Sequence, residues 1–220
     1  MKARSAAAGL LVLASLVLVA MVGGCSSTRR VQGGAAEPAA SSANRSVPLR
    51  PKGVYDGKSF DTRPVDVICK EKGIEFREPR IVIDKSDYIL TLYAGSIPVK
   101  TYKVLFGGNP VDGKKMEGDR STPEGNYVVR DKYPHKQWKY FIWISYPDEQ
   151  DEREYRELKQ AGQLPSSAEI GGEVGIHGPL RDEWQTDGRN WTDGCVSMYR
   201  ADLEELYEHV EVGTPIVITK

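Results

Sequence analysis

Short runs rich in β-branched and aromatic residues recur from Arg80 to the C-terminus and set the strongest limit on the fold. Such residues favour pleated strands over helices. The link at residues 94–96 is too short for a crossover helix, so the strands on either side of it are expected to be antiparallel. We therefore predict a mainly β domain in which one sheet system wraps on itself. The predicted strands are residues 81–83, 88–93, 97–104, 126–130, 141–146, 174–177 and 216–218.

Two longer helices are expected among these strands. Residues 148–161 are strongly charged and contain no helix breaker, which predicts a solvated helix with Tyr155 and Leu158 on its inner face. Apolar residues recur with helical spacing near the C-terminus and predict an amphipathic helix ended by residues 213–215. They are Leu203, Leu206, Tyr207 and Val210.

Two other segments have weaker patterns. Residues 179–190 are polar and are predicted to form a loop. Residues 65–69 fit either a short strand or a helical turn. Cys69, at the end of that segment, is expected to be a small buried apolar residue.

The first residues of the chain have the pattern of an export signal. Lys2 and Arg4 precede an apolar run of 17 residues from Ala6 to Val22, shorter than the roughly 20 apolar residues of a membrane span. Small residues then lead to Cys25, which resembles the lipobox of bacterial lipoproteins. That resemblance implies cleavage of a signal peptide, residues 1–24, and lipidation of Cys25. The alternative is an uncleaved anchor; either predicts a membrane-tied domain facing the periplasm or the cell wall.

The segment that follows is expected to be a flexible tether. Residues 25–50 are rich in Ser, Ala, Gly and Pro and almost lack large apolar side chains. Such a stretch cannot bury enough surface to offset the entropy lost on ordering. Residues 51–79 have no clear pattern and are assigned to an N-terminal extension of uncertain structure.

Charge and cysteine content exclude several classes of function. The chain has 30 basic and 31 acidic side chains, so no basic field for nucleic acid is expected. Three cysteines are too few for a disulfide framework, although a Cys69–Cys195 disulfide would be conceivable in an oxidising compartment and would silence Cys195. No Cys or His spacing is typical of a zinc site, and we expect neither a metal nor an organic cofactor.

Cys195 and His177 are the candidates for chemistry. A thiol is a weak nucleophile at its free pKa of about 8.5, and a histidine base within hydrogen-bond reach activates it. To react, Cys195 is expected to be a thiolate at neutral pH. For either residue alone a structural role is more frequent, but the adjacent glycines and the spacing of 18 positions favour a catalytic pair.

The order of motifs from about Arg80 to Lys220 resembles the L,D-transpeptidase catalytic domain, also called the YkuD fold. In that family a histidine is followed, after a spacer, by Ser/Thr-His-Gly-Cys. The spacer here, residues 178–191, has 14 residues. The resemblance implies a β-sandwich or barrel and a catalytic domain at residues 80–220. The motifs are Gly-Asn-Pro (108–110), Ser-Thr-Pro-Glu-Gly (121–125), Ile-His-Gly (176–178) and Thr-Asp-Gly-Cys (192–195).

The resemblance also implies a reaction on peptidoglycan stem peptides. Cys195 would attack the carbonyl between a third-position diamino acid and a D-amino acid. The resulting thioester would then pass to an acceptor amine of another stem or of a protein. Two alternatives remain open at this point. Water could be the acceptor, as in an L,D-carboxypeptidase, or the domain could bind cell wall without catalysis.

Roles for the neighbouring residues follow from the same resemblance. The Gly178 carbonyl is expected to fix the tautomer of His177, and the backbone N–H groups of Gly194 and Cys195 are expected to bind the oxyanion. Two positions depart from the family. Asp193 replaces the second histidine and could either disfavour a thiolate by like charge or hold a protonated His177.

The second position that differs from the family, and the aromatic residues near it, concern the expected substrate pocket. Ser197 replaces a polar Arg or Asn, a position expected to shape the pocket beside the nucleophile. Trp191 and Arg181, together with Trp184 and Tyr199, could line a groove in which Arg181 or Arg189 meets a substrate carboxylate. The alternative for these side chains is packing and solvated charge.

Overall fold

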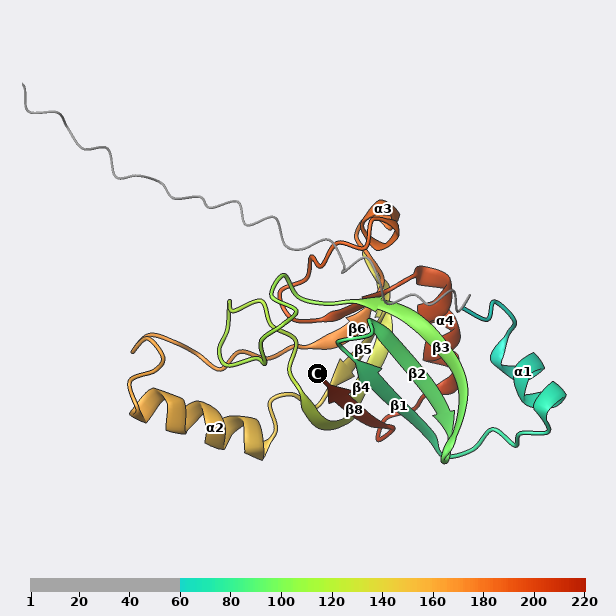
Figure 1. Ribbon diagram of the computed structural model, residues 1–220, viewed down its shortest axis with the longest axis horizontal. Coiled ribbons are helices and arrows are strands. Elements are labelled where there is room, and N and C mark those ends of the chain that lie inside the picture. The colour runs from blue at the N-terminus through green and yellow to red at the C-terminus, as the bar shows by residue number, and fades with distance from the viewer. Residues whose placement is uncertain (1–59) are drawn as a thin grey trace, which may run out of the picture. The chain divides into compact units, whose positions relative to one another are not determined.

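The computed structural model describes residues 60–220, which form eight strands and four helices (Figure 1). The predicted signal peptide, Cys25, the tether and residues 51–59 lie outside the described residues. The strands are β1 (Pro79–Asp84), β2 (Ile89–Ala94), β3 (Ile97–Leu105), β4 (Gly125–His135), β5 (Lys139–Ile144), β6 (Gly175–His177), β7 (Val196–Met198) and β8 (Pro215–Thr219). The helices are α1 (Val65–Lys72), α2 (Glu149–Gln160), α3 (Asp182–Thr186) and α4 (Arg200–His209).

The strands close into one barrel in the order β1-β2-β3-β7-β6-β5-β4-β8. Two neighbouring pairs, β1–β8 and β6–β7, are parallel, and the other pairs are antiparallel. Closure pairs each edge of the sheet with another strand, so no long free edge is left for aggregation. The prediction of a mainly β domain with a sheet wrapped on itself is confirmed.

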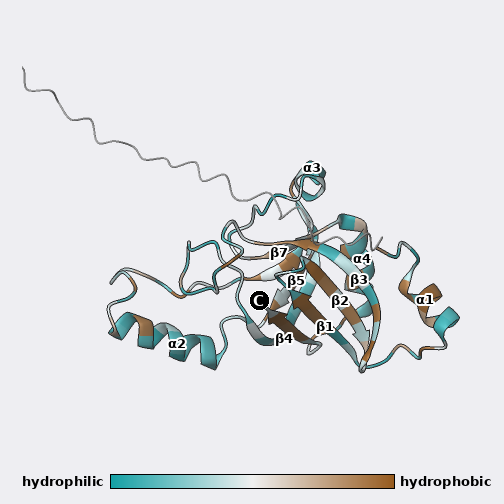
Figure 2. Ribbon diagram, viewed as in Figure 1, coloured by the Kyte–Doolittle hydropathy of each residue, from teal (hydrophilic) through white to brown (hydrophobic). Residues whose placement is uncertain are grey.

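The barrel interior is filled by alternate residues of its strands. In β1, Ile81 and Ile83 are fully buried, and they lie opposite Leu92 and Leu90 of β2. On the other side of β1, Ile81 pairs with Ile216 of β8. Figure 2 shows brown, hydrophobic stretches along β1 and β2. Burial of each Leu or Ile side chain contributes roughly 1.5–3 kcal/mol to the free energy of folding. This apolar interior stabilises the barrel to which β6 and β7 belong.

Helices α1 and α2 differ in how they contact the barrel. Residues 65–69 belong to α1, which settles the earlier ambiguity in favour of a helix, and Cys69 is buried as expected. Helix α2 is capped at its N-terminus by Asp148, whose carboxylate accepts hydrogen bonds from the N–H groups of Gln150 and Asp151. No residue of α2 is buried, and Figures 1 and 2 show a mostly hydrophilic helix that extends away from the barrel. Its Tyr155 hydroxyl donates to the Ala168 carbonyl.

Two short elements near the candidate residues were not predicted. Residues 182–186 form α3, so the expectation of a continuous loop over 179–190 was wrong. The helix has one buried residue, Gln185, whose side chain donates to the Ser197 carbonyl at 3.3 Å. Strand β7 directly follows Cys195 and is held by its neighbours β3 and β6. Elements of three to five residues are too short for a periodic pattern. Within residues 60–220 no helix is long and apolar enough to cross a bilayer.

Candidate active site

Strands β6 and β7 place His177 and Cys195 on one face of the sheet, two positions apart in register. Their parallel register pairs Ile176 with Val196 and His177 with Ser197. Cys195 lies two residues before Ser197, so strand alternation directs its side chain to the face that bears His177. The N–H of Gly175, two residues before His177, donates to the Cys195 sulfur.

The ring of His177 is held in one tautomer. Its Nδ1 lies 2.8 Å from the Gly178 carbonyl oxygen. A carbonyl can only accept, so Nδ1 carries a hydrogen and the neutral ring has its free lone pair on Nε2. The contact expected from the resemblance is present. It leaves Nε2 as the nitrogen that can take a proton from a nucleophile.

Aromatic side chains enclose the imidazole of His177. Trp138 stacks on it with ring centroids 4.4 Å apart, and Trp191 meets it edge-on at 5.5 Å. His177 is 2% exposed. Burial lowers its pKa to about 4, although the hydrogen bond to Gly178 acts in the opposite direction. The ring is therefore neutral at pH 7 and able to accept a proton.

Cys195 is half-buried, and its Sγ lies 3.7 Å from the Glu173 carbonyl oxygen. Burial raises the pKa of Cys195 to about 11, while the Gly175 N–H and the Lys114 ammonium act to lower it. The resting pair is thus a neutral thiol beside a neutral imidazole. The expectation of a thiolate at neutral pH was wrong, because burial opposes a charge on either partner.

Asp193 is paired with Arg120 at the surface. Its exposed carboxylate lies 3.3 Å from Nε of Arg120, and its charge raises the pKa of Cys195. Of the two alternatives for this residue, the structure supports like-charge opposition to the thiolate. An exposed ion pair contributes only about 0–1 kcal/mol to stability. Arg120 also donates through Nη2 to the Trp191 carbonyl at 3.3 Å.

The turn before Cys195 is organised by Thr192. Its hydroxyl donates to the Cys195 carbonyl at 2.7 Å and accepts from the Gly194 N–H at 3.2 Å. The Gly194 N–H can bind an oxyanion only in competition with Thr192. Gly194 has a φ of 139°, and a Cβ atom there would lie 2.8 Å from the Ser121 carbonyl oxygen. A larger residue at this position would displace the turn.

The resemblance led us to expect that Ser197 shapes a pocket beside Cys195, and this expectation was wrong. Ser197 is fully buried, and its hydroxyl donates to the Gln185 Oε1 at 3.1 Å. The Gln185 side chain of α3 packs over β7 and covers Ser197. Tyr199 likewise bonds inward, donating to the Gln185 carbonyl at 3.4 Å. Ser197 and Tyr199 therefore anchor α3 to the sheet.

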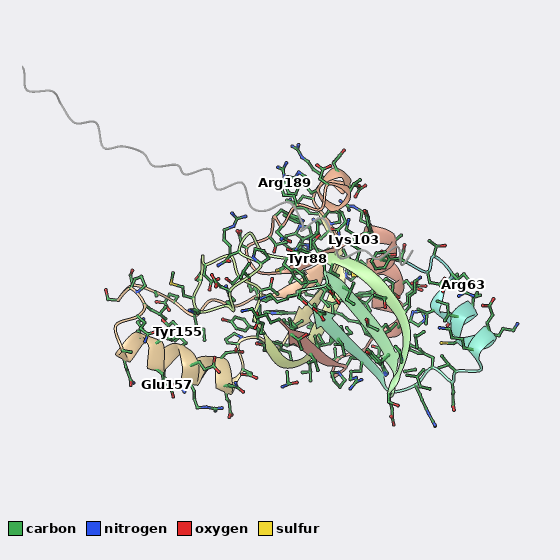
Figure 3. All side chains as sticks on the ribbon, in the orientation of Figure 1. Arg63, Tyr88, Lys103, Tyr155, Glu157 and Arg189 are labelled. Atoms are coloured by element: carbon green, nitrogen blue, oxygen red, sulfur yellow. The ribbon has the colours of Figure 1, made fainter. Side chains whose placement is uncertain are left out.

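The predicted groove residues separate into two positions. Trp191 contacts His177 directly. Arg181 contacts the ring of Trp184, and that ring lies 4.9 Å from the ring of Trp191. Arg181 and Trp184 line a separate cavity of about 620 Å³, and Arg189, at the edge of the molecule beside α3, lines it too (Figure 3). The full lining is Leu180, Arg181, Asp182, Glu183, Trp184, Asp187, Arg189 and Arg200.

Sequence reasoning missed several residues that surround the pair. They come from loops far apart in the chain, and no periodicity marks them. They are Lys114, Arg120, Trp138 and Glu173. Among the cysteines in residues 60–220, Cys69 and Cys195 are both free thiols, so the conceivable Cys69–Cys195 disulfide is not formed. Within the described part of the chain, no cluster of three or more His, Cys, Asp or Glu residues could hold a metal.

The raised pKa of Cys195 predicts how its alkylation depends on pH. Because the thiol remains protonated below a pKa of about 11, its rate of reaction with iodoacetamide should rise about tenfold per pH unit from pH 7 to 10. Peptide mass mapping follows Cys195 separately from Cys25 and Cys69. A rate that is already at its plateau at pH 7 would contradict the neutral-thiol account.

The lowered pKa of His177 predicts a loss of stability in acid. Its folded pKa, about 4, lies below the ordinary 6.5, so the unfolded chain binds the proton first as pH falls. Between pH 7 and pH 5 this residue should lower the free energy of unfolding by about 2 kcal/mol. Urea denaturation of wild type and His177→Gln at pH 7 and pH 5 measures this change in the free energy of unfolding. An equal pH dependence in the two proteins would show that His177 carries no such shift.

Comparisons with known proteins match most of the described chain to one family model. The model of the YkuD family, the L,D-transpeptidase catalytic domain, matches residues 78–218. None of the curated proteins compared with the chain matches it.

Solved structures of similar fold come from several bacteria. The helical cell shape determining protein Pgp2 of Campylobacter jejuni is 21% identical, with a TM-score of 0.49 and coverage of 71% of this chain and 55% of that protein. An L,D-transpeptidase from Mycobacterium smegmatis is 13% identical, with a TM-score of 0.43 and coverage of 65% and 59%. One from Enterococcus faecium is 17% identical, with a TM-score of 0.42 and coverage of 64% and 49%. The chain spans about half the length of these proteins.

Proposed function

The chain belongs to the L,D-transpeptidase catalytic-domain family, and from this membership we propose that it is a peptidoglycan L,D-transpeptidase with Cys195 as nucleophile and His177 as base. One observation carries the assignment of these residues. The Gly178 carbonyl holds Nδ1 of His177 at 2.8 Å, on the strand that neighbours the Cys195 turn. This leaves Nε2 free to act as a base.

The first half of the proposed reaction forms a thioester. Nε2 of His177 takes the proton from the Cys195 thiol while the sulfur attacks the carbonyl carbon of the third-position diamino acid. The carbon–nitrogen bond to the D-amino acid then breaks. The imidazolium gives its proton to the leaving amine, so the D-amino acid departs neutral at nitrogen and the donor stem remains on sulfur.

The second half passes the donor stem to an acceptor. An amine of another stem or of a protein attacks the thioester carbon, and the carbon–sulfur bond breaks. His177 takes a proton from the attacking amine and returns it to the sulfur, which restores the thiol. In both halves the carbonyl oxygen carries transient negative charge. The Cys195 N–H is a proposed donor to it, and each such donor is typically worth about 3–4 kcal/mol in the barrier.

Product analysis tests this proposal. Purified protein is incubated with a disaccharide tetrapeptide and the products are identified by mass. Cross-linked dimer or exchange of the terminal amino acid is the expected result. Tripeptide with free D-amino acid would instead indicate a hydrolase that uses water as acceptor. No change with a folded protein would indicate a wall-binding domain without this activity.

Variants of the pair sharpen the test. Cys195→Ala should abolish product, and His177→Gln should lower kcat by about 10²–10⁴-fold, the usual contribution of a general base. Cys69→Ala is the matched control, because Cys69 is a buried thiol of α1 outside the site and its loss should leave product formation intact. Full activity of Cys195→Ala would overturn the mechanism.

We also propose that the protein is exported and held at the membrane through a lipid on Cys25. The apolar run and small residues before Cys25 support this. Metabolic labelling with a fatty acid should mark the wild type and leave Cys25→Ser unlabelled. Equal labelling of both proteins would remove Cys25 as the modified residue.

A further inference from the structure

We propose that Lys114 takes part in the proposed reaction as a fixed positive charge. Its ammonium group, held beside Gly194, stabilises the negative charge that develops on the Cys195 sulfur and on the carbonyl oxygen under attack. The inference about the substrate oxygen rests on the proposed function. The inference about the sulfur does not, because the reactivity of the thiol is measurable without substrate.

The ammonium group of Lys114 is buried and held in place. The side chain is 4% exposed, and Nζ lies 3.0 Å from Asp119 Oδ1. Nζ also donates to the Met116 carbonyl oxygen at 3.1 Å. An ammonium group has three N–H donors, and these two acceptors account for two of them within the described residues. The third donor is left for an anion.

Gly194 forms the boundary between this ammonium group and the nucleophile's turn. A Cβ atom at Gly194 would lie 3.6 Å from Lys114 Nζ. The ammonium group therefore lies against the backbone immediately before Cys195. Because residue 194 has no side chain, nothing at that position separates the charge from the Cys195 turn. An ammonium group that is shielded from water acts more strongly on a charge that forms in this turn than an exposed one would.

Asp119 fixes the loop that carries Lys114. Its carboxylate accepts from the N–H groups of Lys115 and Met116 through Oδ2 and from the N–H of Ser121 through Oδ1. Burial acts to raise the pKa of Asp119, but these hydrogen bonds and Lys114 together lower it below its ordinary value. The carboxylate stays ionised, so it satisfies the buried ammonium group that would otherwise be costly.

The other charges near the sulfur cannot replace Lys114. Asp193 and Glu173 are carboxylates and raise the pKa of Cys195, whereas Lys114 lowers it. Arg120 is directed to Asp193 and to the Trp191 carbonyl. His177 is neutral in the resting site. Among these groups, Lys114 is thus the cation whose charge favours negative charge on the sulfur while His177 takes the proton.

The test compares Lys114→Met and Lys114→Gln, which remove the charge, with Lys114→Arg, which keeps it. Lys115→Met is the matched control, since the Lys115 side chain is exposed and the loop uses only its backbone N–H. The Gln side chain can still donate to the Met116 carbonyl. Lys114→Gln therefore removes the charge with less disturbance of the loop than Lys114→Met. Circular dichroism and thermal melting verify that each variant is folded.

The first readout is the iodoacetamide reaction of Cys195 as a function of pH. Loss of the charge should lower the rate about tenfold at pH 8, which corresponds to a rise of about one unit in the thiol pKa. Arg should keep most of the rate, and Lys115→Met should match wild type. A folded Lys114→Gln with the wild-type profile would overturn the proposal.

The second readout is turnover of the disaccharide tetrapeptide. Removing the charge should lower kcat at least tenfold with little change in KM, because the charge acts on the reacting atoms and leaves the remote parts of the stem untouched. If alkylation slows but kcat does not change, Lys114 acts only on the thiol. That result would overturn the proposal that Lys114 stabilises the carbonyl oxygen. If the wild type forms no product, the alkylation profile still decides the inference, separately from the proposed function.

Discussion

The parallel pairing of β6 with β7 is the constraint on which the site depends. It places His177 opposite Ser197 and so brings the turn at Cys195 alongside Gly175. Each of these strands has only three residues, so neither is stable by itself. The closed barrel supplies the support, because β5 and β3 pair with their outer sides and the buried interior fixes the register. A slip of one residue would turn His177 into the core.

The site built on this pairing is predominantly uncharged at rest. Burial among Trp138, Trp191 and Phe141 keeps the imidazole neutral and rigid, and burial also keeps the Cys195 thiol protonated. A neutral pair avoids the cost of two desolvated charges until substrate arrives. Fixed donors then meet the charge as it forms. On our account the Gly175 N–H and the Lys114 ammonium group perform this role, and they need no rearrangement at the moment of reaction.

The barrel could be predicted from local patterns, and the spacing of His177 and Cys195 singled out two residues that the fold carries on adjoining strands, whereas their surroundings could not be predicted. Alternating apolar residues such as Ile81 and Ile83 reveal a strand wherever it occurs. The spacing of His177 and Cys195 is informative because the chain between them, which contains α3, returns to place β7 beside β6. Lys114, Arg120 and Trp138 reach the site only through tertiary folding. The charge state of Cys195 also depended on burial, which a motif does not reveal.

The central claim is that His177 is a neutral base that presents Nε2 to the nucleophile. Nitrogen-15 NMR of the histidine side chains measures this most directly, with His177→Gln identifying the resonance among those of His135 and His209. The account predicts that at pH 7 the Nδ1 of His177 carries the hydrogen and Nε2 does not, and that the ring stays neutral down to about pH 5. A hydrogen on Nε2 at neutral pH, or a ring that titrates near its ordinary pKa of about 6.5, would contradict it.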